Sequence, residues 1–351
     1  MSLPVIKKQL RIAHIHVADQ HNKGDVAIVL AVQELLDQTF PGCLIEDFPV
    51  EVLKNYEANT LSRLNQSDLI VLGGGGIFYS YFLPFDLKII KALKTPLIIL
   101  GVGYIREVGA KALNQKQKES LVHLIKKATR VGVRENYTKK FLVKLGLAAQ
   151  KIKVIGDPAT LLKESKPRNF PLSNKLKIGF NLNYSGWLGF GKWREDILKA
   201  YQEVAAYFLK EYGAAGVDFF YLKHHPGEAN IYPELKIKGL RVVDLKPAEQ
   251  KYIYGQLDLV IGMMLHAGVM AFGAGTPEIN VAYDLRNRNF AKFIGCPELV
   301  VELSDLQHGQ LLRMVKRVIK EREYYRAKFV KEKNKINKRH QEFLREVGRL
   351  V

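Results

Sequence analysis

The sequence predicts an α/β protein with two Rossmann-like, doubly wound domains that face a cleft, followed by a long basic C-terminal helix. Three observations lead to this prediction. Short apolar runs alternate with amphipathic helical patterns along most of the chain, which is typical of βαβ units and parallel sheets. The alternation stops once, at residues 164–171, and then resumes. At 351 residues, the chain is also longer than one compact core usually accommodates.

The first half contains apolar runs that we interpret as strands, at residues 10–17, 44–48, 69–72, 96–101, 130–134 and 153–157. Between the first two runs, residues 25–36 repeat apolar side chains at helical spacing. Proline and glycine border the run at 96–101. Because strands that are separated by helices usually pair in parallel, we expect one doubly wound sheet here.

A second series of strands and helices follows a linker. Residues 164–171 contain two prolines and no periodicity, as expected for a linker. Strands are then expected at 177–181, 219–222, 240–244, 259–262 and 278–283, and helices at 193–211 and 266–274. From residue 304 the pattern is helical to the end. The predicted divisions are residues 1–165, 175–303 and 304–351, and the last helix is expected to pack back across the first domain.

The net charge of +19 is high, and part of it lies in basic runs near the C-terminus. An anionic membrane surface, an anionic substrate or nucleic acid would each explain it, as would a solvated helix face. No nucleic-acid-binding motif accompanies the charge, so nucleic acid is the least favoured partner. No apolar run approaches ~18 residues, and the N-terminus does not resemble a signal peptide. Only Cys43 and Cys296 are present, and we interpret them as reduced, buried thiols of a cytoplasmic protein.

Four consecutive glycines at residues 73–76 follow the apolar run at 69–72. A strand that runs into glycines and then into a helix brings backbone N–H groups up to an anion. Alternatively, the glycines end the strand for steric reasons only. Considered with the other strand ends, Gly74, Gly75 and Gly76 are expected to form one wall of the cleft rather than the phosphate grip itself.

Polar and glycine-rich residues also follow other predicted strands. Asn22 can cap the helix that begins there, Gly24 allows close approach, and Asp25 either caps the helix or orients a hydroxyl. Gly101 and Gly103 belong to a second glycine loop. The chain shows no dinucleotide fingerprint, and the glycine run at 73–76 is not a Walker loop because the Lys-Ser/Thr pair is missing. Since ligands bind beyond the carboxyl ends of such strands, these residues are expected to face one cleft.

Charged residues and histidines stand at the remaining strand ends. Arg134 either holds a carboxylate or phosphate, or only pairs with the neighbouring glutamate. His225 belongs to an adjacent histidine pair whose rings should point to different faces, so zinc is not expected there. His266 lies where a strand gives way to a helix and is either an acid–base group or a structural, hydrogen-bonded residue. Arg286 follows the last predicted strand and is expected to face the cleft.

Taken in order, these segments resemble the polysaccharide pyruvyl transferase family. The matching segments are Asn22-Lys23-Gly24-Asp25, Gly74-Gly75-Gly76, Gly101-Val102-Gly103, Val131-Gly132-Val133-Arg134-Glu135, Asp157-Pro158-Ala159, Leu265-His266-Ala267, Gly275-Thr276-Pro277 and Tyr283-Asp284 with Arg286. The resemblance covers residues from about 20 to 295. It implies a two-domain fold like that of the GT-B glycosyltransferases.

The resemblance also implies an activity, the transfer of pyruvate from phosphoenolpyruvate onto two hydroxyls of a sugar. The product would be a cyclic ketal on a cell-surface polysaccharide precursor. His266 would be the catalytic acid, and the acceptor a glycan or a lipid-linked sugar. Phosphoenolpyruvate is the donor substrate, and neither a cofactor nor a metal is expected. The substrate-binding candidates are Asn22, Gly24, Asp25, Gly74, Gly75, Gly76, Gly103, Arg134, His225 and Arg286.

One position departs from the family pattern. The family commonly reads Arg-Leu-His where this chain reads Met264-Leu265-His266. Arg286, Arg288 or Lys223 could replace the missing guanidinium. The departure keeps two alternatives open, a nucleotide-sugar glycosyltransferase of the same architecture and a non-catalytic basic binding protein. With the family activity, the C-terminal charge predicts loose attachment to the inner face of the plasma membrane, where lipid-linked acceptors reside.

Overall fold

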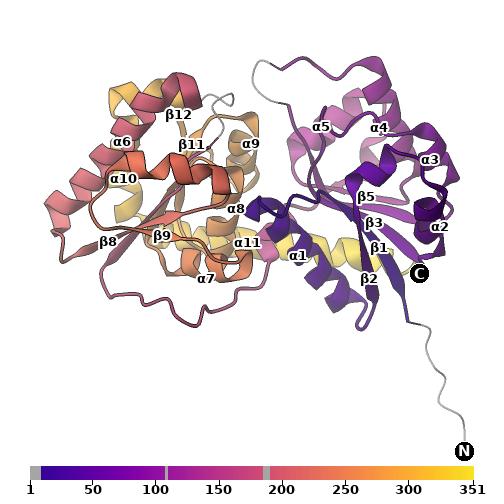
Figure 1. Ribbon diagram of the computed structural model, residues 1–351, viewed down its shortest axis with the longest axis horizontal. Helices are drawn as coiled ribbons and strands as arrows, with labels where there is room; N and C mark the ends of the chain where they lie inside the picture. The colour runs from indigo at the N-terminus through magenta and orange to yellow at the C-terminus, as the bar shows by residue number, and fades with distance from the viewer. Residues whose placement is uncertain (1–8, 107–109, 185–189) are drawn as a thin grey trace, which may run out of the picture.

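The computed structural model describes residues 9–106, 110–184 and 190–351, and this part of the chain forms two parallel six-stranded sheets flanked by helices (Figure 1). The first sheet has the strand order β2-β1-β3-β4-β5-β6. Its strands are β1 (Arg11–His16), β2 (Leu44–Pro49), β3 (Leu69–Phe78), β4 (Leu97–Tyr104), β5 (Arg130–Val133) and β6 (Ile152–Val154). Its helices are α1 (Lys23–Thr39), α2 (Ala58–Gln66), α3 (Leu87–Ala92), α4 (Gln115–Lys127) and α5 (Asn136–Lys144).

The second sheet has the strand order β12-β11-β10-β7-β8-β9. Its strands are β7 (Leu176–Phe180), β8 (Val217–Leu222), β9 (Leu240–Val243), β10 (Leu259–Gly262), β11 (Glu278–Ala282) and β12 (Val300–Glu302). Its helices are α6 (Phe190–Tyr212), α7 (Pro247–Gln256), α8 (Leu265–Ala274) and α9 (Leu285–Phe293). The strands predicted for both halves are present. The sequence prediction missed β12, a strand of three residues at the edge of the second sheet.

The two sheets share one continuous apolar core. Along β3, Leu69 and Val71 face the helix α1, whereas Ile70 and Leu72 face a separate core on the other side of the first sheet. The core on the α1 side extends without a break into the second sheet, where it includes Phe180. The halves are therefore held together by apolar packing as well as by the chain connection. The residue limits predicted for the domains remain a prediction.

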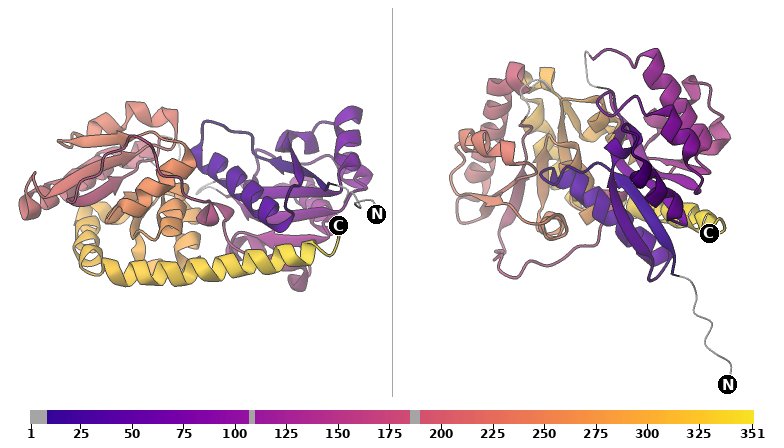
Figure 2. Two further views of the ribbon diagram at one scale, coloured as in Figure 1. Left: turned by 90° about the horizontal axis from the view of Figure 1, so that it is seen from below. Right: turned by 45° about the vertical axis from the view of Figure 1, so that its right-hand side comes forward.

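The C-terminal segment consists of α10 (Gln310–Lys320) and α11 (Arg322–Val347), and α11 runs along the underside of both sheets (Figure 2). In the second half, Phe329 of α11 packs against Phe272 of α8, with ring centroids 5.0 Å apart. In the first half, Phe343 of α11 lies over β5 and Ile336 lies over the chain after β6. The last helix thus packs back across the first sheet, as predicted. Among the helices of the described residues, none is long and apolar enough to cross a membrane.

The glycine run does not form the predicted loop. Its four residues continue β3 to Phe78, and the next helix, α3, begins only at Leu87. Pairing with β4 also continues, since Gly73 lies beside Leu100 and Gly75 beside Val102. The prediction was wrong because the ladder of backbone hydrogen bonds needs no side chain, so glycines can extend a central strand. For the same reason β4 passes through its own glycines to Tyr104, and the second predicted glycine loop is strand.

The two cysteines differ in burial. Both are free thiols, and Cys296 is buried. Cys43 is only half-buried, near the start of β2, so the expectation of two buried thiols is wrong for that residue.

Candidate functional site

A cavity of about 600 Å³ lies where the carboxyl ends of strands from both sheets meet. Its lining comes from the ends of β1, β3, β4 and β5 in the first sheet, and of β10 and β11 in the second. This edge is where open parallel sheets bind their ligands. The predicted site residues that line the cavity are Asn22, Asp25, Gly76, Arg134, His266 and Arg286.

His266 lies in the first turn of α8, and its imidazole is close to a carboxylate from the other half of the chain. Its Nε2 is 3.6 Å from Oδ2 of Asp157, which follows β6 and is fully buried. Burial opposes ionisation of Asp157, but His266, Arg134 and the N–H of Ala159 outweigh it and lower the pKa of this carboxyl. A buried carboxylate that stays ionised can orient an imidazole and stabilise its protonated form.

Two glycines make room for side chains of the site rather than for a ligand. A Cβ on Gly24 would lie 2.2 Å from Nδ1 of His266. A Cβ on Gly103 would lie 2.6 Å from Nη2 of Arg134. Both distances are far below any real Cβ contact, so the glycines allow the imidazole and the guanidinium to lie directly against α1 and β4.

Arg134 follows β5 and is 5% exposed. Its Nε donates a hydrogen bond to Glu135 at 2.7 Å, and its Nη1 lies 3.5 Å from Asp157. Burial opposes the charge of Arg134, but Glu135 and Asp157 outweigh it and raise the pKa of the guanidinium. Arg134 therefore both pairs with its neighbouring glutamate and presents a fixed positive charge at the cavity wall.

Asn22 and Asp25 have separate roles at the start of α1. The side-chain oxygen of Asn22 accepts a hydrogen bond from the N–H of Gly24 at 3.0 Å and so caps the helix. Asp25 does not cap the helix, and its carboxyl lines the cavity. Burial raises the pKa of Asp25 to about 6, although His266, Arg286 and Arg134 favour its ionised form. A carboxyl with such a pKa can exchange protons near neutral pH.

Arg286 lies in the first turn of α9, the next helix of the second half, and lines the cavity. Its Nε donates to Asp284 at 2.9 Å, so its guanidinium is held by a buried carboxylate. Met264, which stands where the family commonly has arginine, also lines the cavity. Of the basic residues proposed as substitutes, Arg286 is the one on the cavity wall, since Arg288 and Lys223 are engaged in ion pairs elsewhere.

Other predicted site residues lie outside this cavity. A Cβ on Gly74 would lie 1.8 Å from Ile28 of α1, so this glycine and its neighbour Gly75 lie against the helix. His225 stacks on Tyr184 with ring centroids 3.9 Å apart, and its Nδ1 accepts a hydrogen bond from the N–H of Gly227. The preceding His224 is buried and pairs with Tyr254. The adjacent histidines therefore point apart, as predicted.

Several lining residues were missed by the sequence analysis. Aromatic side chains follow the glycine run, and Tyr79, Tyr81 and Phe82 pack against one another at the cavity. The density of aromatics immediately after a strand was the available signal. Such rings offer flat apolar surfaces beside polar groups. Aromatic rings beside charged side chains suit a ligand that has both anionic groups and a ring with an apolar face.

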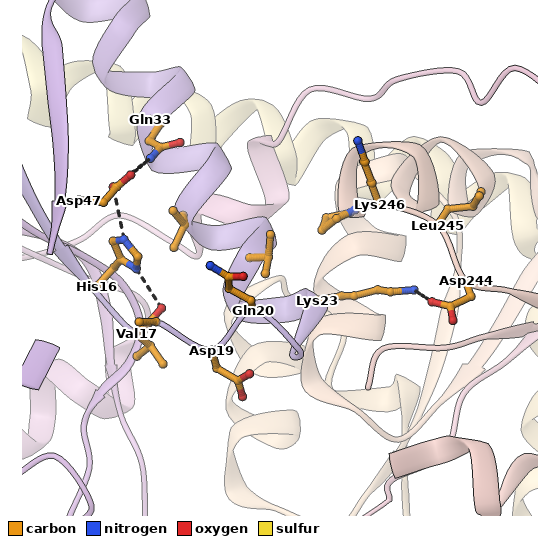
Figure 3. Close-up of a pocket in the computed structure, with 14 residues that line it drawn as sticks. His16, Val17, Asp19, Gln20, Lys23, Gln33, Asp47, Asp244, Leu245 and Lys246 are labelled. Atoms are coloured by element: carbon orange, nitrogen blue, oxygen red, sulfur yellow. Dashed lines mark hydrogen bonds and ion pairs between the residues drawn. The ribbon is translucent and has the colours of Figure 1, made fainter. Parts of the chain in front are cut away.

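A second cavity, of about 710 Å³, adjoins the first around the loop after β1 (Figure 3). Both cavities are lined by Val17, Ala18 and Asp19. At one side of the second cavity Lys23 donates to Asp244 at 2.6 Å, and at the other side lie His16 and Asp47. The cavity therefore extends between α1 and the second sheet.

Comparison with solved structures defines the class of protein as one with the GT-B-like fold. Anabaena HepE in complex with UDP-glucose is 13% identical, with 97% of this chain and 99% of that chain covered and a TM-score of 0.57. A putative UDP-N-acetylglucosamine 2-epimerase from Listeria monocytogenes is 10% identical, with 94% of each chain covered and a TM-score of 0.57. S. aureus MnaA with UDP is 10% identical, with 92% of this chain and 91% of that chain covered and a TM-score of 0.55. At these identities the likeness concerns the fold alone.

Within that class, the family can be stated. A family model described as polysaccharide pyruvyl transferase matches residues 22–284. The chain belongs to the polysaccharide pyruvyl transferase family. The matched range begins at the Asn22 cap and ends at Asp284, and it therefore includes both sides of the cavity.

Proposed function

We propose that this protein transfers pyruvate from phosphoenolpyruvate to two hydroxyls of a sugar in a cell-surface polysaccharide precursor and releases inorganic phosphate. The observation that supports this most directly is the pairing of His266 with buried Asp157 beside Arg134, in a cavity that also contains Arg286. An acid held next to two guanidinium groups suits a donor that must be protonated on carbon and carries two anionic groups.

Arg134 and Arg286 would hold the donor. Phosphoenolpyruvate carries a phosphate and a carboxylate, and guanidinium groups bind both kinds of anion through paired hydrogen bonds. Each arginine is already oriented by a buried carboxylate, which keeps its remaining N–H groups in place without a donor. In this proposal Arg286 supplies part of the charge that the family arginine would have contributed at Met264.

His266 would protonate the donor. Since Nε2 faces Asp157, Nδ1 is the nitrogen that can exchange a proton with a substrate. The C3 methylene of phosphoenolpyruvate takes this proton, and a sugar hydroxyl oxygen forms a bond to C2. Asp25, with its pKa of about 6, would accept the proton that this hydroxyl loses.

Ring closure follows from the same groups. The bond between C2 and the phosphate oxygen breaks, and inorganic phosphate leaves toward the arginines. A second hydroxyl of the same sugar then bonds to C2 and gives its proton to the neutral His266, while the proton held by Asp25 leaves with the phosphate. In total, phosphoenolpyruvate and a diol give a cyclic ketal and inorganic phosphate. The aromatic side chains of Tyr79, Tyr81 and Phe82 would contact the sugar ring.

Phosphate release tests this proposal. The purified chain is incubated with phosphoenolpyruvate and candidate lipid-linked or nucleotide-linked sugars, and acceptor-dependent phosphate is measured. We expect turnover that falls about 10²–10⁴-fold in His266→Gln. His123→Gln is the matched control, because His123 is exposed on α4, a helix that contributes no residue to the lining of the cavity. Absence of turnover and of phosphoenolpyruvate binding with every acceptor would overturn the proposal.

A nucleotide-sugar glycosyltransferase is the second candidate, and Met264 is the observation that favours it. Loss of a guanidinium from the donor side weakens the case for phosphoenolpyruvate. Two of the structures with a similar fold hold UDP or UDP-glucose. Thermal-shift measurements with phosphoenolpyruvate, UDP and UDP-sugars separate the candidates, because a ligand that binds the folded state raises the melting temperature. Stabilisation by UDP-sugars alone would favour the second candidate.

The proposed location is cytoplasmic, with loose contact at the inner face of the plasma membrane. Lys331, Lys335 and Lys338 lie on the exposed side of α11. Basic residues near an anionic bilayer each contribute about 1 kcal/mol to binding at low salt. Sedimentation with phosphatidylglycerol vesicles at low salt tests the contact. Binding that persists when all three lysines are changed to glutamate, or no binding by the unaltered chain, would contradict it.

A further inference from the structure

Two histidines and a carboxylate come together at the edge of the second cavity. His14 and His16 are two residues apart on β1 and therefore point to the same face of the sheet. The parallel strand β2 places Asp47 directly beside His14. Oδ1 of Asp47 lies 3.3 Å from Nδ1 of His14 and 3.3 Å from Nε2 of His16. These ligand atoms all lie within 4.8 Å of one another.

His16 makes one hydrogen bond through Nδ1, and its other ring nitrogen, Nε2, faces the carboxylate of Asp47. Its Nδ1 is 2.9 Å from the carbonyl oxygen of Val17. Because a carbonyl can only accept, Nδ1 must carry the proton, and the neutral ring then presents the lone pair of Nε2 to Asp47. Two acceptors that face each other at 3.3 Å need a cation between them, either a proton or a metal ion.

The surroundings of His14 also indicate a cation at this position. Its side chain is fully buried, and among the described residues neither ring nitrogen makes a hydrogen bond of good geometry, although Nδ1 lies 3.3 Å from Oδ1 of Asp47. Buried polar atoms without partners are uncommon in folded proteins.

The two distances from Oδ1 of Asp47 to the histidine nitrogens match those of a metal site more closely than those of a hydrogen-bonded cluster. In a tetrahedral site with metal–ligand bonds of about 2.0 Å, neighbouring ligand atoms lie about 3.3 Å apart. A charge-assisted hydrogen bond would be shorter, at about 2.7–2.9 Å. Nε2 of Gln33 on α1 lies 3.0 Å from each carboxylate oxygen of Asp47 and so orients the carboxylate (Figure 3).

We propose that His14, His16 and Asp47 bind one divalent transition-metal ion of the zinc class. The ligands are Nδ1 of His14, Nε2 of His16 and Oδ1 of Asp47, and a remaining coordination position is directed at the cavity that His16 and Asp47 line. The ion joins β1 to β2 beneath the loop of Val17, Ala18 and Asp19, which both cavities share. This site does not depend on the proposed transferase activity, and it departs from the expectation of no metal.

Calorimetric titration of the untagged, chelator-treated full chain with Zn²⁺ tests the site. We expect one Zn²⁺ per chain, with affinity reduced about 100-fold or more in His16→Gln and Asp47→Asn, and about 10-fold in Gln33→Ala. His123→Gln, an exposed histidine on α4, is the matched control and should bind as the unaltered chain does. Absorption of the Co²⁺-loaded chain in the visible range should disappear in the same two ligand variants.

Folding of the variants is checked independently. The side chain of His16 is 13% exposed and that of Asp47 is 48% exposed, so neither substitution creates a cavity in the apolar core. Circular dichroism should be unchanged, and saturating Zn²⁺ should raise the melting temperature of the unaltered chain and of His123→Gln but not of His16→Gln. The proposal is overturned if the unaltered chain binds no Zn²⁺, or if His16→Gln and Asp47→Asn bind it equally well. Either result would mean that the cluster holds a proton only.

Discussion

Nδ1 of His266 occupies the space directly above Gly24, 2.2 Å from where a Cβ would stand. The three atoms nearest to that point all belong to His266, and the backbone of Gly24 is not in the left-handed region. The glycine in the first turn of α1 is therefore explained by the histidine of α8 and not by helix geometry. Gly24 of the first half thus determines whether His266, the candidate acid of the second half, can adopt its position.

Gly24→Ala should displace His266 while leaving the fold intact. Alanine is the better helix former, so the helix itself is expected to gain slightly in stability. The imidazole must rotate away from Asp157, and we expect phosphate release to fall at least about 10-fold. Gly255→Ala in α7 is the control, since no atom lies closer than 3.6 Å to its added Cβ. Unchanged turnover in Gly24→Ala would show that the position of His266 is unimportant.

Asp157→Asn should slow phosphate release. The substitution keeps the shape of the side chain but removes the negative charge 3.6 Å from Nε2 of His266. The imidazole then loses the carboxylate beside it, and Arg134 loses one of its two acidic neighbours, so we expect turnover to fall about 10-fold or more. Steady-state phosphate release measures this. Turnover equal to that of the unaltered chain would show that this carboxylate has no part in the reaction.

Asp25→Asn should stabilise the protein above pH 6 and have little effect at pH 4. Burial raises the pKa of Asp25 to about 6, so the folded state binds more protons than the unfolded state between roughly pH 4 and pH 6. Stability from this group is present at low pH and is lost as the pH rises through 6. Removing the charge should therefore add about 1–3 kcal/mol at pH 8. Urea unfolding at both pH values measures it, with exposed Asp37→Asn on the same helix as the control. Equal effects of Asp25→Asn at pH 4 and pH 8 would contradict the expectation.

Lys251→Met should weaken the connection between the two halves. Nζ of this fully buried lysine on α7 donates to the carbonyl oxygens of Thr160 at 2.8 Å and Leu162 at 2.7 Å, and it lies 3.3 Å from that of Ala159. Methionine fills a similar volume but leaves these carbonyls unpaired, which should cost about 3 kcal/mol of unfolding free energy. Lys320→Met, exposed on α10, should cost little. Similar urea midpoints for the two variants would rule out this role for Lys251.

The alternation of apolar strands and amphipathic helices was enough to predict both sheets. The error at Gly74 and Gly75 has a clear origin, because a glycine has no side chain whose burial pattern could reveal a strand. The backbone pairing of these residues depends on β4, which lies far along the chain. Tertiary partners of this kind are not visible in a local sequence pattern.

For the candidate site, too, the sequence predicted some residues and missed the contacts that depend on tertiary structure. Strand-end reasoning selected His266, Arg134 and Arg286, since the topology of parallel sheets brings such ends together. It did not reveal that Asp157 lies 3.6 Å from His266, because the contact crosses between the sheets. Nor did it connect His14 with Asp47, whose proximity depends on the register of β1 against β2.

The position of α11 has a consequence for synthesis of the protein. Ile336 and Phe343 cover the space over Gly156 and Gly132, at the β5–β6 side of the first sheet. During translation, this part of the sheet leaves the ribosome well before the residues that cover it. At about 5–20 residues per second, the delay is on the order of 10–40 s. The first sheet therefore emerges with an apolar surface that α11 covers only later, and a nascent chain stalled before residue 336 should depend on chaperones to stay soluble.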